Sequence, residues 1–275
     1  MKKLSTLLLL LLPFIALSGG WPKKKGSGYY KLGYSIINGK HFYDELGDKI
    51  PLERGLNFNT LSVYAEYGVT DRLTAISYVP FATTAKLAMQ TGATSASITT
   101  LGDINVGFRY GLIVDKPTVL SISATFGLPT GRTSTSTAGG EESLQTGDGE
   151  FNQFVTLETG HSLDRDFYAS AFAGMNFRSN GFSDEIRFGG EIGHVSDALI
   201  SILKFESINS LNNGDNTASA NSDIFNNNME LLSIAPELSL KLSDKFGLSI
   251  NHTIYLSGKK TLASPNTTFG IFWDL

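Results

Sequence analysis

Apolar residues alternate with polar or small residues in about a dozen segments of this chain, and this alternation constrains its fold more than any other feature. The stretch GDINVGFRYGL (102–112) is an example. Because successive side chains of a β-strand point to opposite faces, each such segment predicts a strand with one apolar and one polar face. The segments with this pattern are 30–36, 61–67, 73–81, 104–112, 120–128, 151–159, 167–177, 186–192, 199–207, 232–242, 246–256 and 269–275.

The connections between these segments alternate between short and long. The short ones each contain an Asp, which favours turns because its side chain accepts hydrogen bonds from nearby backbone N–H groups: they are 69–72, 114–117, 163–165, 196–197 and 243–245. The long ones are rich in Ser, Thr, Asn and Gly: they are 39–57, 82–101, 130–150, 179–183, 209–228 and 258–266. This sorting of loops by length is typical of bacterial outer-membrane barrels, which have short periplasmic turns and long external loops.

The expected fold is therefore an all-β, transmembrane up-and-down antiparallel barrel of about twelve strands. Segments of nine to eleven residues suffice to cross a bilayer at a tilt, and in hydrocarbon the last strand must pair with the first because no open edge is tolerated. On this interpretation Ile104, Val106 and Phe108 face lipid. A soluble lipocalin-like barrel or a sandwich is the alternative.

The N-terminal stretch MKKLSTLLLLLLPFIALSGG has two lysines, a short apolar run and small residues, which is the pattern of a secretory signal peptide. We expect a signal peptide over 1–20 and a single barrel domain over 21–275. The chain has no cysteine, so disulfides and thiol chemistry are excluded. A net charge of −4 gives no basic surface for nucleic acid.

Strand parity also selects side chains that face the lumen. The candidates are Tyr64, Glu66, Asp103, Arg109, Glu158, Tyr168, Arg178, Arg187, Glu191 and Tyr255. Facing Arg and Glu residues either form a constriction that selects solutes by charge or form ion pairs that fill the lumen and rigidify the wall. The inward aromatic residues either line a path for apolar solutes or simply fill a narrow barrel.

Two further sets of residues are placed by the same model. Aromatic residues near the periplasmic strand ends fit an interfacial girdle: they are Tyr29, Tyr30, Tyr67, Phe167, Phe246 and Trp273. The segment 21–28, with Lys23, Lys24 and Lys25, either plugs the lumen or lies at the periplasmic rim.

Catalysis has little support in the sequence. His161 lies beside a turn that contains Asp164, and His252 lies between Asn251 and Thr253, but neither forms a recognisable nucleophile, base and orienting group. No motif for a metal or a nucleotide occurs in a suitable context. We therefore predict no catalytic residues, no metal and no cofactor.

Five motifs occur in an order that suggests a family: YGVTDRL (67–73), YVPF (78–81), LGDINVGFRYGL (101–112), GLPTG (127–131) and TGDGEF (146–151). Together they resemble the outer-membrane β-barrel family named after the meta-pathway of phenol degradation, a transporter family, from about Leu56 to the C-terminus. The resemblance implies an outer-membrane barrel that takes up or exports small organic molecules. It carries over no catalytic residues.

The main hypothesis is a passive outer-membrane channel of a Gram-negative-type bacterium for small organic molecules with apolar or aromatic parts. Its partners would be the bilayer, the solute and the barrel-assembly machinery, since Phe269, Ile271, Trp273 and Leu275 share one face of a terminal strand, although barrels more often end in Phe or Trp. The alternatives are a plugged barrel that acts through its external loops and an outer-membrane lipid-modifying enzyme.

Overall fold

The computed structural model describes residues 19–87, 97–133, 144–215 and 227–275. All the helices and strands that it assigns in these ranges are β-strands, with no helix among them. Twelve strands are long, and β4 and β13 are short. Their bounds are β1 Gly28–Tyr43, β2 Lys49–Gly68, β3 Leu73–Leu87, β4 Ser97–Thr100, β5 Ile104–Ile113, β6 Thr118–Leu128, β7 Asn152–Ser162, β8 Phe167–Arg178, β9 Glu185–Val195, β10 Leu199–Ser210, β11 Glu230–Ser243, β12 Phe246–Lys259, β13 Thr261–Leu262 and β14 Asn266–Asp274. These residues include no helix long and apolar enough to cross a membrane.

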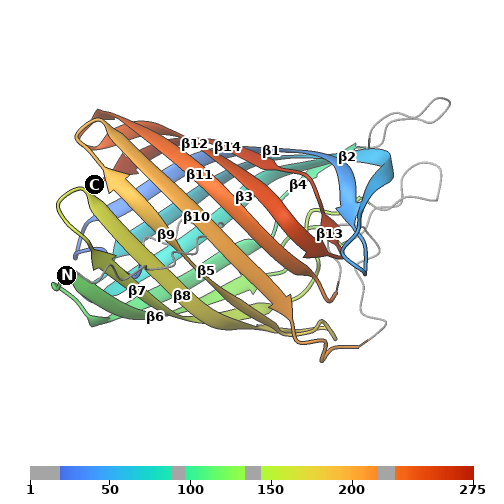
Figure 1. The fold of residues 1–275 in the computed structure, drawn as a ribbon, viewed down its shortest axis with the longest axis horizontal. Coiled ribbons are helices and arrows are strands. Elements are labelled where there is room, and N and C mark those ends of the chain that lie inside the picture. The colour runs from blue at the N-terminus through green and yellow to red at the C-terminus, as the bar shows by residue number, and fades with distance from the viewer. Residues whose placement is uncertain (1–18, 88–96, 134–143, 216–226) are drawn as a thin grey trace, which may run out of the picture.

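The long strands form one closed antiparallel barrel (Figure 1). Each long strand pairs with the next along the chain, and β1 pairs on one side with β2 and on the other with β14, which closes the sheet. The short strands extend this sheet, because β4 pairs with β3 and β13 with β1. The predicted twelve-stranded up-and-down topology is confirmed.

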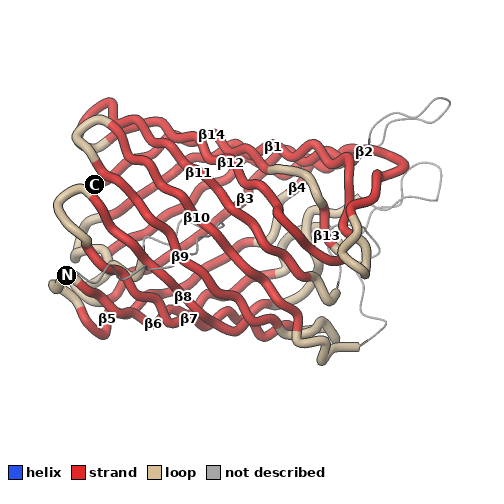
Figure 2. The backbone as a smooth tube through the Cα atoms, in the orientation of Figure 1, coloured by secondary structure: helices blue, strands red, loops and turns tan. Residues whose placement is uncertain are grey.

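The connections fall into two classes at opposite ends of the barrel, as predicted. Residues 69–72, 114–117, 163–166, 196–198 and 244–245 make tight turns at what we term the short-turn end. Asp164 illustrates their chemistry, because its carboxylate accepts hydrogen bonds from the backbone N–H groups of Asp166 and Phe167 at 2.8 and 3.0 Å. The opposite, long-loop end carries the longer connections (Figure 2).

Several strands extend further toward the long-loop end than the sequence pattern indicated. Residues 39–57 were expected to form a loop, but β1 runs to Tyr43 and β2 begins at Lys49. Likewise β3 runs to Leu87 and is joined by β4, within residues expected to be a loop. The prediction of these strand ends was wrong because backbone pairing continues where the apolar face stops, and only the apolar face leaves a signal in the sequence.

Side chains sort by parity along each strand into an exposed apolar outer face and a buried polar inner face. On β5, Phe108 is 52% exposed whereas Arg109 is 0% exposed. The outer face continues around the barrel with residues such as Leu157, Leu238 and Phe269, each about half exposed in the isolated chain. A closed sheet with such an outer surface is suited to hydrocarbon, where every backbone group is paired and apolar side chains meet lipid.

The proposed signal peptide lies almost entirely outside the described residues, which begin at Gly19. The division into a signal peptide and one barrel domain therefore stays a prediction.

Candidate functional site

The lumen contains one arginine held between two carboxylates. Arg109 on β5 donates from Nη1 to Oε1 of Glu66 at 2.9 Å and from Nε to Oε2 of Glu158 at 2.7 Å. All three side chains are at most 2% exposed. Tyr64 donates its hydroxyl to Glu66 at 2.7 Å, and Thr156 donates to Glu158 at 2.9 Å. We call Glu66, Arg109 and Glu158 the central trio, in which one guanidinium binds two carboxylates.

A second ionic cluster joins β1, β10 and β11. Glu237 accepts hydrogen bonds from Nζ of Lys31 at 2.8 Å and from Nζ of Lys204 at 2.7 Å. Glu191, which lies across from Lys204 on β9, accepts a hydrogen bond from the Tyr168 hydroxyl at 2.8 Å. Charges that are removed from water are stable only when they are paired and hydrogen-bonded, and this cluster meets that requirement.

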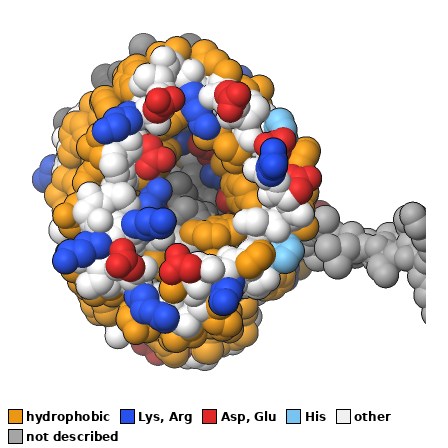
Figure 3. Space-filling view, turned by 90° about the vertical axis from the view of Figure 1, so that its left-hand side faces the viewer, with side chains coloured by type: hydrophobic (Ala, Val, Ile, Leu, Met, Phe, Trp, Pro, Cys, Tyr) orange, Lys and Arg blue, Asp and Glu red, His pale blue; other side chains and the backbone are white. Residues whose placement is uncertain are grey.

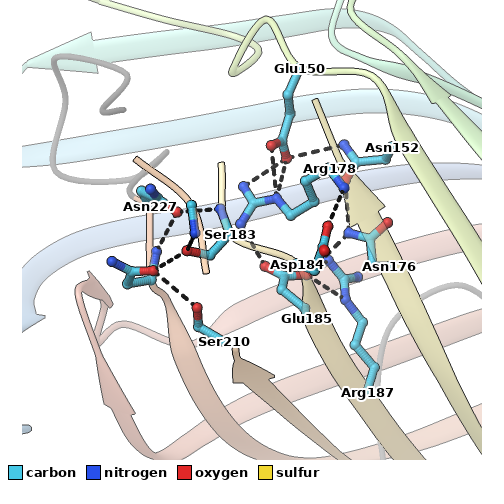
Figure 4. A network of polar contacts seen from close by, with 12 residues as sticks. Glu150, Asn152, Asn176, Arg178, Ser183, Asp184, Glu185, Arg187, Ser210 and Asn227 are labelled. Carbon is cyan, nitrogen blue, oxygen red and sulfur yellow. Dashed lines mark hydrogen bonds and ion pairs between the residues drawn. The ribbon is translucent and has the colours of Figure 1, made fainter. Parts of the chain in front are cut away.

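A third cluster lies at the long-loop end, where Figure 4 shows two arginines and two glutamates converging from β8, β9 and the segment before β7. Arg178 binds both oxygens of Glu150 through Nε, at 2.7 and 2.8 Å, and reaches Glu185 through Nη1 at 2.8 Å. Nε of Arg187 donates to the other oxygen of Glu185 at 2.9 Å. These ion pairs link the long-loop end of β8 and β9 to the β6–β7 connection.

The β6–β7 connection folds back toward the barrel. Leu144 is 2% exposed and packs with Leu56, Phe58 and Ala85 of β2 and β3. Asp103, which lies just before β5, accepts hydrogen bonds from the backbone N–H groups of Gly131 at 2.7 Å and Asp148 at 3.2 Å. Three of the motifs quoted above, LGDINVGFRYGL, GLPTG and TGDGEF, therefore meet at one place.

The carboxyl groups of Asp103, Asp148 and Glu150 lie close together here, and the pKa values of two of them are raised. Burial raises the pKa of Asp103 to about 6. The hydrogen bonds that Asp103 accepts from backbone N–H groups oppose this rise, and the negative charge of Asp148 adds to it. Burial together with Asp148 also raises the pKa of Glu150 to about 8, against the opposing effect of Arg178. Both groups lie outside the strands, at the long-loop end.

The N-terminal segment lies inside the barrel near the short-turn end. Gly20 accepts a hydrogen bond from Ser121 at 2.6 Å, and the ring of Trp21 meets the ring of Tyr168 edge-on, with 5.6 Å between their centroids. The backbone N–H of Lys23 donates to Thr74 at 2.7 Å. We call residues 19–27 the strap, because they run along the inner wall from β8 to β2. The sequence left two alternatives for this segment, a plug in the lumen or a position at the rim. The structure combines them, since Trp21 lies in the lumen whereas Lys24 and Lys25 are exposed at its rim.

Two cavities lie on either side of the region that the strap and the central trio occupy. One, of about 240 Å³, lies toward the long-loop end, and we call it the chamber. It is lined by Ile76, Thr125, Phe154, Thr156, Glu158, Phe172, Arg187, Glu206, Ile208 and Met229. The other, of about 340 Å³, opens at the short-turn end beside Trp21, Tyr168 and Glu191. Figure 3 shows this end as a hollow with acidic and basic side chains interspersed around it.

The aromatic residues divide between the two faces, and one expectation is corrected. Tyr67, Phe167 and Trp273 are between 37% and 46% exposed near the short-turn end. Tyr29, however, stacks on Phe272 with 5.9 Å between ring centroids and so points inward. Tyr29 and Tyr30 are consecutive on one strand, so they cannot both belong to an outer girdle.

The candidate lumen residues are thus placed as follows. Eight of the ten belong to the three ionic clusters or hydrogen-bond to them, and one of these, Arg187, also lines the chamber. Asp103 precedes its strand and holds a loop. Tyr255 accepts a hydrogen bond at its backbone oxygen from the Tyr43 hydroxyl at 3.2 Å. Sequence reasoning missed Lys31, Glu150 and Glu237 and did not decide the position of the strap.

The histidines do not form a catalytic arrangement. Nδ1 of His161 is 2.7 Å from the Thr118 hydroxyl, and Nδ1 of His252 is 2.8 Å from the Thr267 hydroxyl. Neither contact includes a carboxylate that would orient a general base. Among the described residues, no three His, Cys, Asp or Glu side chains are grouped to hold a metal ion.

Comparison with solved structures gives the fold a place. The COG4313 outer membrane channel from Pseudomonas putida F1 superposes with a TM-score of 0.71 over 95% of this chain and all of that one, at 13% identity. The chain has the fold of an outer-membrane β-barrel. The NanC porin matches with a TM-score of 0.55 over 90% of this chain, at 9% identity, and covers all of that chain. The β-domain of the Bordetella autotransporter BrkA matches with 0.54 over 91%, at 11% identity, again with full coverage of its chain.

No family model matches the sequence, and no curated protein matches it. The likeness is therefore one of fold, and it is shared by a channel, a porin and an autotransporter domain. The choice among functions has to come from the lumen itself.

Proposed function

We propose that this protein is an outer-membrane channel that lets small organic molecules with apolar or aromatic parts cross passively. The observation that carries the proposal is a pair of cavities, one in the lumen toward the long-loop end and one that opens at the short-turn end, with aromatic and charged side chains on their walls. The fold shared with the COG4313 channel and the NanC porin supports it. So do the ordered motifs that resemble the family of the meta-pathway of phenol degradation.

Location follows from the same proposal. The exposed apolar outer face fits a bilayer, and a closed barrel of this kind fits the outer membrane of a Gram-negative bacterium. Insertion there would use the barrel-assembly machinery, for which β14, with Phe269 and Trp273 on its outer face, is the proposed signal.

The polar interior suits selection by fit rather than bulk flow of ions. The central trio and the strap narrow the barrel between the two cavities, so a solute has to pass close to Glu158 and the rings of Trp21 and Tyr168. Such a path disfavours large hydrated solutes, because they would lose water without matching partners.

A second function is supported by the strap and the inserted β6–β7 connection. Both reduce the free lumen, which fits a plugged barrel that acts through its external loops. The segments that would then matter, 82–101, 130–150 and 209–228, lie only partly within the described residues.

The decisive experiment is solute flux into liposomes that carry the refolded protein. Sugars, amino acids and simple aromatic alcohols, acids and amines would each be tested, with protein-free liposomes as the control. Selective entry of aromatic compounds supports the channel. No entry of any solute through a barrel that shows the heat-dependent gel shift of a folded porin favours the plugged barrel instead.

A further inference from the structure

One wall of the chamber holds a buried carboxylate, one oxygen of which receives no hydrogen bond from the described residues. Glu206 on β10 is 4% exposed and lines the chamber. Its Oε2 has no hydrogen-bond partner among the described residues. In contrast, Glu158 on β7, which also lines the chamber, is held by Arg109 and Thr156.

The strands on both sides of Glu206 explain why no partner reaches it. Its cross-strand neighbours are Gly189 on β9 and Ser233 on β11. Gly189 has no side chain, and the Ser233 hydroxyl is itself buried without a hydrogen-bond partner in the described part of the chain. Two adjacent acceptor-bearing groups therefore lie unsatisfied in the wall, which is costly for a buried polar atom.

The nearby cations donate their hydrogen bonds to other carboxylates, although Arg187 still attracts Glu206 electrostatically. Arg187, which also lines the chamber, donates through Nε to Glu185 at 2.9 Å, and Lys204, two residues before Glu206, donates to Glu237 at 2.7 Å. The chamber lining itself has two carboxylate side chains, Glu158 and Glu206, and one cationic side chain, Arg187. A ligand with a positive charge would therefore complement this lining.

Half of the residues that line the chamber are apolar, and two of these are aromatic. Phe154 and Phe172 meet edge-on with 6.2 Å between centroids, and Ile76, Ile208 and Met229 complete the apolar lining. The guanidinium of Arg187 already lies 5.3 Å from the centroid of Phe154, so a cation against this aromatic wall is an arrangement the fold itself uses. A dry apolar cavity of about 150 Å³ is large enough for benzene, and the chamber, at about 240 Å³, leaves room for a short substituent.

We propose that the chamber is a binding site for small organic ammonium compounds, in which Glu206 accepts hydrogen bonds from the ammonium group and the Phe154–Phe172 wall packs against an apolar or aromatic body. This inference rests on the proposed channel function and specifies its substrate class. An ammonium group has three donors, which suits a carboxylate oxygen and a neighbouring hydroxyl that both lack hydrogen-bond partners among the described residues.

The test compares three ligands of one shape: 2-phenylethylamine, 2-phenylethanol and phenylacetate. Binding to the full barrel in lipid nanodiscs is measured by calorimetry at pH 7, with empty nanodiscs subtracted. We expect the amine to bind about tenfold to a hundredfold more tightly than the alcohol, and the acid to bind least, because a charge-assisted hydrogen bond adds to the same apolar contact. Equal binding of amine and alcohol by the wild-type barrel overturns the proposal and requires no variant.

Variants then assign the effect to Glu206. Glu206→Gln preserves size and removes the charge, so the amine should lose its advantage while binding of the alcohol changes little. Glu230→Gln removes a carboxylate that is paired with Lys259 at the rim, at 2.8 Å, and should leave amine binding unchanged. An unchanged preference for the amine in Glu206→Gln would contradict the proposal.

Flux separates this proposal from the channel itself. If all three compounds enter liposomes at the same rate and neither variant matters, the channel stands and the ammonium site is wrong. If no compound enters but the amine still binds through Glu206, the site stands and the channel is wrong.

Discussion

Arg109 on β5 and Glu158 on β7 are separated by the intervening strand β6, yet Nε of the arginine is 2.7 Å from Oε2 of the glutamate. The strand between them presents Ser121 and Ser123 at this level, and both are buried. Small side chains on β6 therefore let two long charged side chains meet across it. The same arginine also holds Glu66, so it connects three parts of the barrel wall.

Arg109→Met should destabilise the barrel by about 3–5 kcal/mol, because it leaves two buried carboxylates without their shared cation. Unfolding in urea from lipid vesicles measures this loss. Lys259→Met is the matched control, since it removes one partner of a rim pair, and exposed pairs contribute about 0–1 kcal/mol. Adding Glu66→Gln and Glu158→Gln to Arg109→Met should restore most of the lost stability. A small effect of Arg109→Met alone would contradict the role of the central trio.

Parity made much of this lumen predictable. Along β5 and β7 the alternation of Phe108 with Arg109 and of Leu157 with Glu158 places each side chain on its face, since the period of a strand is two residues. The signal is strong here because a charged residue on the lipid-facing surface costs free energy, most of all near the middle of the bilayer. Where both faces are apolar, as around Phe205 on β10, the pattern is ambiguous and only the polar demands of Lys204 and Glu206 indicate the inner face.

Other features could not be read from the sequence for physical reasons. Lys31 and Glu237 are 206 positions apart and meet only because the barrel closes. The strap follows no period, since Trp21 and Pro22 pack on the wall individually. Leu144 lies in a polar connection, and a single buried leucine there leaves no pattern.

Phe108→Arg should destabilise the barrel by about 2–4 kcal/mol, because it places a charge on the lipid-facing surface near the middle of a spanning strand. Phe108 is 52% exposed in the isolated chain, so a soluble protein would accept this change with little loss. Leu46→Arg, in the β1–β2 connection at the long-loop end and 83% exposed, is the matched control and should have almost no effect. The fraction that inserts and refolds in vesicles across a urea series measures both. Equal tolerance of the two substitutions would argue against a bilayer around the barrel.

The β6–β7 connection should be held more firmly at pH 5 than at pH 7.5. The pKa of Asp103 is raised to about 6, above its ordinary value of 3.8, so its proton stabilises the folded arrangement. That contribution is complete below pH 3.8 and is lost as the pH rises through about 6, when Asp103 and Asp148 repel each other. The raised pKa of Glu150 acts in the same direction up to about pH 8.

Amide hydrogen exchange of residues 128–133 and 144–150, corrected for the intrinsic effect of pH, measures this change. Asp148→Asn removes the neighbouring charge and should reduce the difference between the two pH values. The idea fails if the wild-type protein is protected equally at both, or if Asp148→Asn keeps the full pH dependence.

Gly160→Ala should displace the strap while leaving the barrel intact. A Cβ at this position on β7 would lie 2.3 Å from the ring of Trp21 and 2.2 Å from the backbone oxygen of Gly19. Gly33→Ala is a suitable control, because its added methyl group would face the lumen at 3.3 Å or more from any neighbour and far from the strap. In a Trp273→Phe background Trp21 is the single tryptophan, so its quenching by acrylamide reports the strap alone. We expect greater quenching and faster solute flux with Gly160→Ala than with Gly33→Ala, because the strap narrows the short-turn end. Greater quenching without any rise in flux would mean that the strap does not limit the passage of solutes.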